Sequence, residues 1–266
     1  MKKTKQLTFS KKIQQICKSR FSNGPKQVID DMIQLSFNIM TTPMFMTRFP
    51  RTRYYLDETM TAEVRRYEHD PQAWQLLQDL VLDFFKAIND AEPFTDVIGS
   101  LYDEYLGEVL GQFLTPSDVA DALAEFQVIF MEQPAEKQII GDTCGCGAGS
   151  LILAMLRSIM RHHGEDTMQH LEVVAMDLDP NLVRMCSVQI VMSALVHGIP
   201  LNGFIAHCGN TLTDYAPKEG QKSTLALAWH PMMSKMDYFE AGPEAAAMQK
   251  IMKRFSSEEE SKGIQA

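Results

Sequence analysis

The sequence lacks several features that mark specialised classes of protein. No run of about 18 apolar residues occurs, so no segment is long enough to span a membrane as a helix. The basic amino terminus is not followed by the apolar stretch that a secretory signal requires. The five scattered cysteines are an odd number, which favours a reducing compartment over a disulfide framework. We therefore expect a cytoplasmic globular protein.

Acidic residues are absent before Asp30, and charge is unevenly distributed along the chain. Residues 1–66 contain 13 Lys and Arg against 5 acids, whereas residues 67–266 contain 12 against 29. The early basic residues are Lys2, Lys3, Lys5, Lys11, Lys12, Lys18, Arg20 and Lys26. Such a tract can neutralise the phosphates of a nucleic acid, although a frayed chain end is the alternative. DNA is therefore a candidate partner of this basic N-terminal region.

The first part of the chain has the apolar spacing of helices. Residues 28–42 place apolar side chains three and four positions apart, and residues 95–109 repeat this period. Residues 56–91 contain two further helical patterns, divided near Pro71. The stretch 40–57, interrupted by two prolines, predicts an irregular connector.

After Pro134 the pattern changes to strands that alternate with helices. The expected strands are residues 138–141, 171–176, 203–207 and 224–229, and the expected helices are 150–162 and 181–196. This alternation predicts βαβ units and a parallel sheet. We expect an α/β protein in three parts: a helical region with a basic tail (1–95), a Rossmann-like domain (96–250) and a polar tail (251–266).

A glycine-rich turn and a later acid predict a nucleoside cofactor. Gly145 and Gly147 follow a predicted strand and precede a helix, so the backbone can approach a ligand closely. Asp177 ends the next strand, where a Rossmann-like site binds ribose hydroxyls. Cys144 and Cys146 supply two metal ligands where a structural zinc site needs four, so we expect no metal.

Five segments, in order, resemble the N6-adenine DNA methylases, in particular the modification subunits of type I restriction systems. The first is residues 96–123, which contain the sequence GQFLTP, and the second is the glycine turn at 143–147. The others are DLDP at 177–180, ALVHGI at 194–199 and CGNTL at 208–212. The resemblance implies a class I methyltransferase core that binds S-adenosylmethionine. It implies these cofactor-binding residues: Phe113, Thr115, Pro116, Asp142, Cys144, Gly145, Gly147, Asp177 and Asn210.

Two of these positions depart from the family pattern. Asp142 occupies the usual proline position, and Gly141 stands where the family has its acid, so the register of the turn is open. Asn210 replaces the usual aspartate, although its amide oxygen can still accept a hydrogen bond.

The catalytic loop of the family, [DNS]-P-P-[YFW], is degenerate in this sequence. It is expected after the fourth strand, where the chain instead has Trp229, His230, Pro231 and Met232. An indole donates but cannot accept a hydrogen bond, so Trp229 cannot orient a target amine. No Pro-Pro dipeptide occurs elsewhere, and we expect too little chain after Pro231 for a target-recognition domain.

The sequence therefore leaves three functions to compare. The first is a DNA (adenine-N6) methyltransferase of a restriction-modification type, working with an altered loop or with a separate specificity or target-recognition protein. The second is a catalytically silent relative with a regulatory or DNA-binding role. A dinucleotide enzyme is the weakest, because the GQFLTP segment has no role in one.

Overall fold

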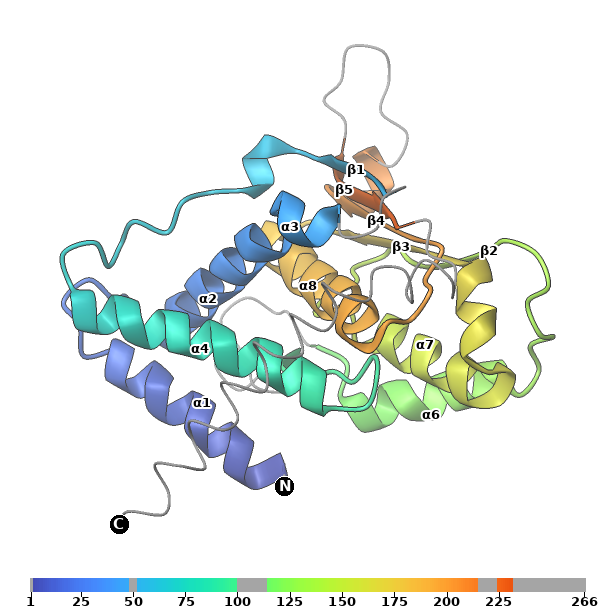
Figure 1. Cartoon of the computed structure of the whole chain (residues 1–266), viewed down its shortest axis with the longest axis horizontal. Helices are drawn as coiled ribbons and strands as arrows, with labels where there is room; N and C mark the ends of the chain where they lie inside the picture. Colours follow the sequence, from blue (N-terminus) through green and yellow to red (C-terminus); the bar gives the residue numbers. More distant parts are fainter. Residues whose placement is uncertain (1, 48–51, 100–113, 215–223, 232–266) are drawn as a thin grey trace.

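A computed structural model describes residues 2–47, 52–99, 114–214 and 224–231 of the 266-residue chain (Figure 1). Its sheet has five strands in the order β1-β5-β4-β3-β2. The strands are β1 (Arg53–Leu56), β2 (Gln138–Asp142), β3 (Leu171–Asp177), β4 (Gly203–Cys208) and β5 (Leu225–His230). Strands β2, β3 and β4 are parallel, whereas β5 is antiparallel to β4 and β1 is antiparallel to β5.

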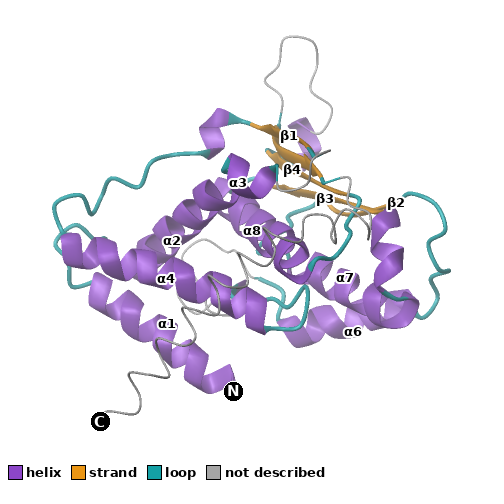
Figure 2. Cartoon of the chain, in the orientation of Figure 1, coloured by secondary structure: helices purple, strands orange, loops and turns teal. Residues whose placement is uncertain are grey.

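The long helices lie on one side of this sheet (Figure 2). The α-helices are α1 (Lys2–Ile16), α2 (Pro25–Met40), α3 (Pro43–Met46), α4 (Pro71–Asp90), α6 (Ser117–Val128), α7 (Ser150–His163), α8 (Pro180–His197) and α9 (Thr211–Asp214). Two 3-10 helices are η1 (Glu58–Met60) and η3 (Glu165–His170). None of the helices in the described ranges combines the length and the apolar character needed to cross a bilayer.

Helix α8 lies at the centre of the structure. It packs against β3 and β4 on one side and against α2 and α4 on the other. Most of its residues are buried, which is the pattern of a helix surrounded by protein. Its start is fixed by Pro180 and by Asp179, whose Oδ1 accepts from the Asn181 amide at 2.8 Å. Gly198 ends it in the left-handed conformation.

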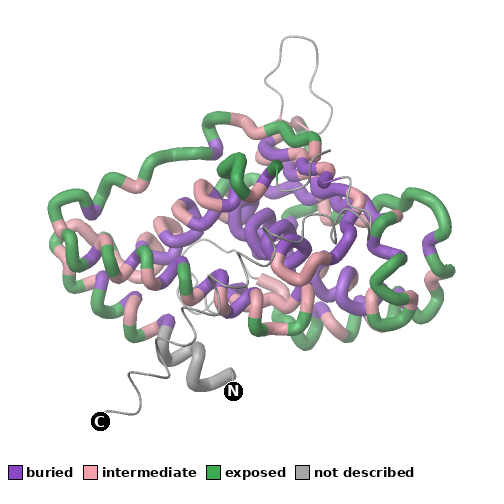
Figure 3. The backbone as a smooth tube through the Cα atoms, viewed as in Figure 1, coloured by how far each residue is buried: buried purple, intermediate pink, exposed green. Residues whose placement is uncertain are grey.

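One hydrophobic core runs through the amino-terminal helices and the α/β part (Figure 3). It extends from Phe9 on α1, through Phe37 on α2 and Phe84 on α4, to Phe204 and Trp229 in the sheet. The amino-terminal region also contributes β1 to the sheet. The predicted boundary near residue 95 therefore does not separate two cores.

The α/β class and most of the predicted elements are confirmed, but two segments differ from the prediction and two fall largely or wholly outside the described residues. The stretch 40–57 is not wholly irregular, because it contains α3 and β1, and β1 forms only by pairing with β5. Residues 56–70 contain η1 in place of the predicted helix. The predicted helix 95–109 falls largely, and the predicted tail 251–266 wholly, outside the described residues.

The prediction that all the strands are parallel was wrong for β5. Its residue Trp229 pairs with Phe204 of β4 in an antiparallel register, and Leu227 pairs with Ala206. The Cys208 amide donates to the Thr224 carbonyl at 2.8 Å, so the chain returns beside the strand that it has just left. Alternation of elements along the sequence therefore did not determine the direction of the last strand.

Candidate functional site

The carboxyl ends of β2, β3 and β4 meet at one edge of the sheet, and hydrogen bonds join the loops that follow them. The Cys146 amide donates to the Met176 carbonyl at 2.9 Å, which attaches the turn after β2 to the end of β3. The Gly209 amide donates to the Asp177 carbonyl at 2.9 Å, which attaches the turn after β4 to the same strand. In doubly wound sheets, ligands bind at this edge.

The turn between β2 and α7 depends on glycine. Gly145, Gly147 and Gly149 have φ values of 123°, 55° and 91°, which side chains other than hydrogen rarely permit. At Gly149 an added Cβ would also lie 2.9 Å from the Sγ atom of Cys186 on α8. The turn therefore combines positive φ values with a close approach to α8.

Asp177 occupies the position that the sequence predicts for a sugar-binding acid. Its side chain ends β3 and is only 8% exposed. Its Oδ2 accepts from the Gly147 amide and its Oδ1 accepts from the Asp179 amide, both at 2.9 Å. An ionised carboxylate has about four acceptor positions, so two amides leave acceptor capacity for a ligand hydroxyl.

A second acid, Asp142, lies at the end of β2. Burial raises the pKa of its carboxyl above the usual 3.8, the Cys144 amide lowers it, and the charge of Asp177 raises it further. The two acids end neighbouring parallel strands, since Asp142 is the last residue of β2 and Asp177 the last residue of β3. Two negatively charged hydrogen-bond acceptors suit a ligand that offers hydroxyl and ammonium donors.

Asn210 begins the turn after β4, beside the glycine turn. Its side-chain Oδ1 accepts from the backbone amide of Leu212 at 2.9 Å, and its backbone amide donates to Oδ2 of Asp214 at 2.9 Å. The Thr211 hydroxyl donates to the Thr143 carbonyl, which joins this turn to the turn after β2. The structure thus brings Asn210 to the same edge of the sheet as Asp142 and Asp177.

Two apolar residues of this edge were missed by the sequence reasoning. Leu178 follows Asp177 and is 69% exposed, and Leu212 follows Asn210 by two positions and is 94% exposed. Large apolar side chains exposed beside polar acceptors are typical of sites for a flat, partly apolar ligand. The available signal was a leucine one or two residues after a polar side chain that follows or ends a strand, which periodicity alone does not single out.

The cysteines of the turn have different surroundings. Cys144 is exposed, whereas Cys146 is buried beside Cys186, and both are free thiols. The hydrogen bond with Cys186, together with burial, raises the pKa of the Cys146 thiol well above its usual value of 9.0. A thiol held in this form is a poor nucleophile and a poor metal ligand. The described residues contain no group of three or more His, Cys, Asp or Glu side chains that could hold a metal ion.

The segment before α6 contacts the glycine turn. An added Cβ at Gly147 would lie 2.9 Å from Cδ2 of Leu114, so this leucine already packs on the turn. Thr115 and Pro116 follow it directly, and Pro116 is the N-cap residue of α6. Phe113, predicted with them, lies outside the described residues.

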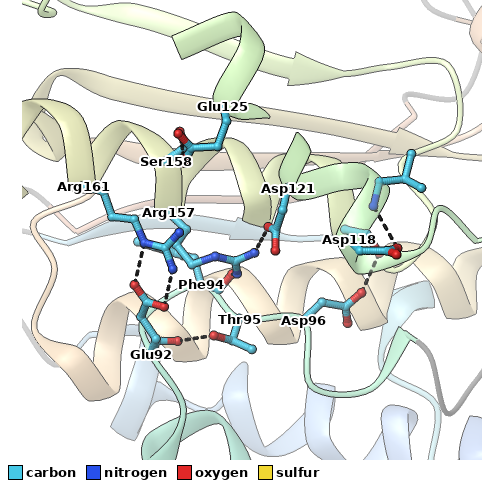
Figure 4. A network of polar contacts seen from close by, with 12 residues as sticks. Glu92, Phe94, Thr95, Asp96, Asp118, Asp121, Glu125, Arg157, Ser158 and Arg161 are labelled. Atoms are coloured by element: carbon cyan, nitrogen blue, oxygen red, sulfur yellow. Dashed lines mark hydrogen bonds and ion pairs between the residues drawn. The ribbon is translucent and has the colours of Figure 1, made fainter. Parts of the chain in front are cut away.

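A polar network, buried at Arg157 and exposed at Arg161 and Glu92, anchors the chain segment 92–99 against α6 and α7 (Figure 4). Arg157 on α7 is 6% exposed and donates to the Phe94 carbonyl at 2.7 Å and to Asp121 on α6. Arg161, one turn further along α7, forms a bidentate pair with Glu92 at 2.8 and 2.6 Å. Bidentate arginine pairs fix geometry as well as charge.

The same segment is also bonded to the glycine turn and to α8. Asp96 accepts from Ser150, the first residue of α7, at 2.6 Å. Gln189 on α8, only 1% exposed, accepts from the Val97 amide at 2.9 Å and donates to the Ala148 carbonyl at 2.9 Å. Gln189 thus links segment 92–99 directly to the turn that carries the cofactor prediction.

The degenerate loop lies at the opposite end of the sheet from this site. Because β5 is antiparallel, Trp229 lies beside Phe204, near the start of β4. His230 approaches Glu172, with 3.7 Å between Nδ1 and Oε2, and Glu172 is five residues before Asp177 on β3. Five residues of strand span about 17 Å. Trp229 and His230 therefore lie away from the glycine turn and Asp177.

The described residues of the degenerate loop pack against the rest of the protein. Trp229 is fully buried, and its Nε1 has no hydrogen-bond partner among the described residues. The Pro231 carbonyl accepts from the Thr52 hydroxyl at 3.3 Å, beside β1. Met232 lies outside the described residues. Trp229 in particular belongs to the hydrophobic core.

The fold and this edge of the sheet define a methyltransferase core of the Rossmann-like type. A family model described as N-6 DNA Methylase matches residues 94–259, which is more than half of the chain. The chain belongs to the N-6 DNA methylase family. A search of the curated proteins finds no match to this sequence.

Proposed function

We propose that the chain binds S-adenosylmethionine at the carboxyl ends of β2, β3 and β4. The observation that carries the proposal is the buried Asp177 carboxylate, which faces the glycine turn and accepts from the Gly147 amide at 2.9 Å. Family membership supports it, because N-6 DNA methylases generally use this cofactor. The cofactor supplies the methyl group, and the chain's own residues bind and orient it.

In this proposal each part of the cofactor has its own residues. Asp177 accepts from the ribose hydroxyls, and Asp142 accepts from the ammonium group of the methionine end. Leu178 and Leu212 cover the two faces of the adenine ring, and Asn210 accepts from its amine. Thr115 and Pro116 lie over the methionine end, together with Phe113. Gly145 and Gly147, with the neighbouring Cys144, leave room for the backbone to approach the ligand.

Calorimetry with S-adenosylmethionine and its demethylated product tests the binding site. Asp177→Ala is expected to weaken binding by at least about tenfold, because a hydrogen bond to a charged group contributes about 1.5–3 kcal/mol. Asp179→Ala is the matched control, since it removes an N-cap from α8 and should lower stability by about 1 kcal/mol with little effect on affinity. Binding that survives Asp177→Ala unchanged would refute the site.

The proposed reaction is methylation of adenine N6 in DNA, with a partner that supplies the groups orienting the target amine. Family membership supports DNA as the substrate. The need for a partner rests on β5, which carries Trp229 and His230 about 17 Å from the cofactor edge. A specificity or target-recognition protein is the partner that the resemblance to type I modification subunits suggests.

The same observation favours a second function, in which the chain alone binds the cofactor without transferring its methyl group. Transfer of tritiated methyl to adenine-containing DNA separates the two functions. Incorporation by the purified chain that Asp177→Ala abolishes would establish activity without a partner. Cofactor binding without incorporation would establish that the chain alone is silent. Transfer that appears when a partner protein is added would then support the first function.

The basic amino-terminal tract is a proposed DNA-binding surface of narrower extent than the sequence suggests. Phe9, Ile13 and Ile16 bury one side of α1 in the core, and Lys12 pairs with Asp83 at 2.6 Å. Lys11 on α1 and Lys18 in the turn that follows it are exposed.

Deleting the whole tract would disturb the core, so Lys11→Gln with Lys18→Gln is the better test of DNA binding. The logarithm of DNA affinity should fall less steeply with the logarithm of salt concentration. The slope should become shallower by about 0.9 for every phosphate that these lysines no longer neutralise. An unchanged slope would refute the involvement of these two lysines.

A further inference from the structure

Helix α6 carries a row of large apolar side chains on its outer face. Val119, Leu123, Phe126 and Phe130 are 46%, 48%, 68% and 75% exposed. Spacings of four and three residues place Val119, Leu123 and Phe126 within an arc of about 60° on a helix with 3.6 residues per turn. Phe130 lies two residues beyond Val128, the last residue of α6, in a turn where its amide donates to the Gln127 carbonyl at 3.3 Å and its ring packs edge-on against that of Phe126. We name these four residues the α6 stripe.

The α6 stripe is separate from the face with which α6 packs on the protein. Ala120 and Ala124 point toward α7, where they form a small cluster with Ala154. Ile129, 63% exposed, widens the outer apolar surface at its carboxyl end. In the part of the chain that the structure describes, no element covers this surface.

Of the three acids of α6, Asp118 is exposed next to Val119, whereas Asp121 and Glu125 contact α7. Asp121 is paired with Arg157 of α7. Glu125 accepts from Ser158 at 2.9 Å and lies 2.7 Å from a ring nitrogen of His162, both on α7. The flanks of the stripe are Ala122 and Ile129 on one side and Gln127 on the other, and none of these is charged. Docking of an apolar partner would therefore desolvate few charges.

We propose that the α6 stripe is the interface through which two copies of this chain associate, with the two α6 helices antiparallel. Spacings of four, three and four are those of a coiled-coil seam. In a two-fold antiparallel pair, Leu123 faces Phe126 of the other copy, and Val119 faces Phe130. Each facing pair of residues thus combines a smaller with a larger side chain, which is the arrangement that fills the space between the helices evenly.

The area of the surface agrees with a weak dimer. The stripe and Ile129 expose on the order of 500 Å² in each copy, since a buried aromatic side chain alone covers about 150–250 Å². Two copies would then bury on the order of 1,000 Å², which is the lower limit for a specific interface. Antiparallel helices also place Asp118 of one copy far from Asp118 of the other. We expect a dissociation constant in the micromolar range.

Sedimentation equilibrium of the full chain over a range of concentrations tests the proposal. Phe126→Glu is expected to raise the dimer dissociation constant at least about tenfold, because it places an unpaired charge in the centre of the seam. Leu82→Glu on α4 is the matched control, since Leu82 is 45% exposed and lies outside the stripe. A chain that stays monomeric at roughly 200 micromolar, or a dimer that Phe126→Glu leaves intact, overturns the proposal.

A mixing experiment tests the antiparallel register. Leu123→Lys alone and Phe126→Glu alone should each be monomeric, whereas their equimolar mixture should dimerise, because the introduced lysine and glutamate face one another. Leu123→Lys mixed with Val119→Glu is the control and should not dimerise, because position 119 faces position 130. Circular dichroism of each variant shows that it is folded. Equal recovery in both mixtures would overturn the register, and recovery in the first alone would support it.

Discussion

The two ends of the parallel strands differ in the residues that surround them. At the carboxyl ends of β2, β3 and β4, the Asp177 carboxylate accepts from the Gly147 amide and the backbone is shaped by glycines with positive φ. At the amino ends, where β5 brings the degenerate loop, Trp229 is fully buried. The comparison shows that the glycine turn and Asp177 lie at one end of the sheet, whereas Trp229 of the degenerate motif is part of the core at the other end.

The largest expected effect is the loss of stability on replacing Trp229. Trp229→Ala should lower the free energy of unfolding by about 3–5 kcal/mol, because it leaves a cavity in the core. Urea denaturation measures it, and Tyr55→Ala is the control, since Tyr55 is an aromatic residue of the same sheet that is 47% exposed. A variant that keeps its stability but loses methyl transfer would show that the loop is functional, and the comparison would fail.

A smaller loss of stability is expected on replacing Gln189, the residue of α8 that is hydrogen-bonded to the glycine turn. Gln189→Leu removes the acceptor of the Val97 amide and the donor to the Ala148 carbonyl, and leaves both groups buried. The cost should be about 2 kcal/mol, with weaker cofactor binding because Ala148 belongs to the glycine turn. Gln75→Leu on the exposed side of α4 should change stability by less than about 0.5 kcal/mol. An equal free energy of unfolding for the two variants would show that the hydrogen bonds of Gln189 do not contribute to stability.

The smallest effect is a pH dependence at Asp142. Burial, as the main cause, raises the pKa of this carboxyl above 3.8, so the folded state disfavours its ionised form. A raised pKa contributes stability below 3.8 that is lost as the pH rises through the folded value. Asp142→Asn should therefore stabilise the fold at pH 7, by less than about 1 kcal/mol because solvent screens this half-exposed group.

Thermal denaturation between pH 3 and pH 7 measures the effect at Asp142. The difference between Asp142→Asn and the unmodified chain should shrink as the pH falls toward 3.8. Asp79→Asn, on the exposed side of α4, is the control. A difference that stays constant across this range would mean that the ionisation of Asp142 is not the cause.

Much of the candidate site could be predicted from the sequence because its residues are close to strand ends. Gly145, Gly147 and Asp177 need only two parallel strands and a crossover helix to come together, and each of these has a clear pattern. Asn210 follows by the same reasoning. Leu178 and Leu212 could not be selected, because whether a leucine is exposed depends on which elements cover it.

The sequence by itself determined the local elements, the glycine turn and the acid that faces it, since short-range sterics and hydrophobic period fix these. Only the tertiary structure decided the direction of β5, the burial of Trp229, the strand β1 and the network around Gln189. Each of these depends on partners between 16 and 179 positions away in the chain. Pairing of such distant segments is selected by packing of the whole core, which no local pattern encodes.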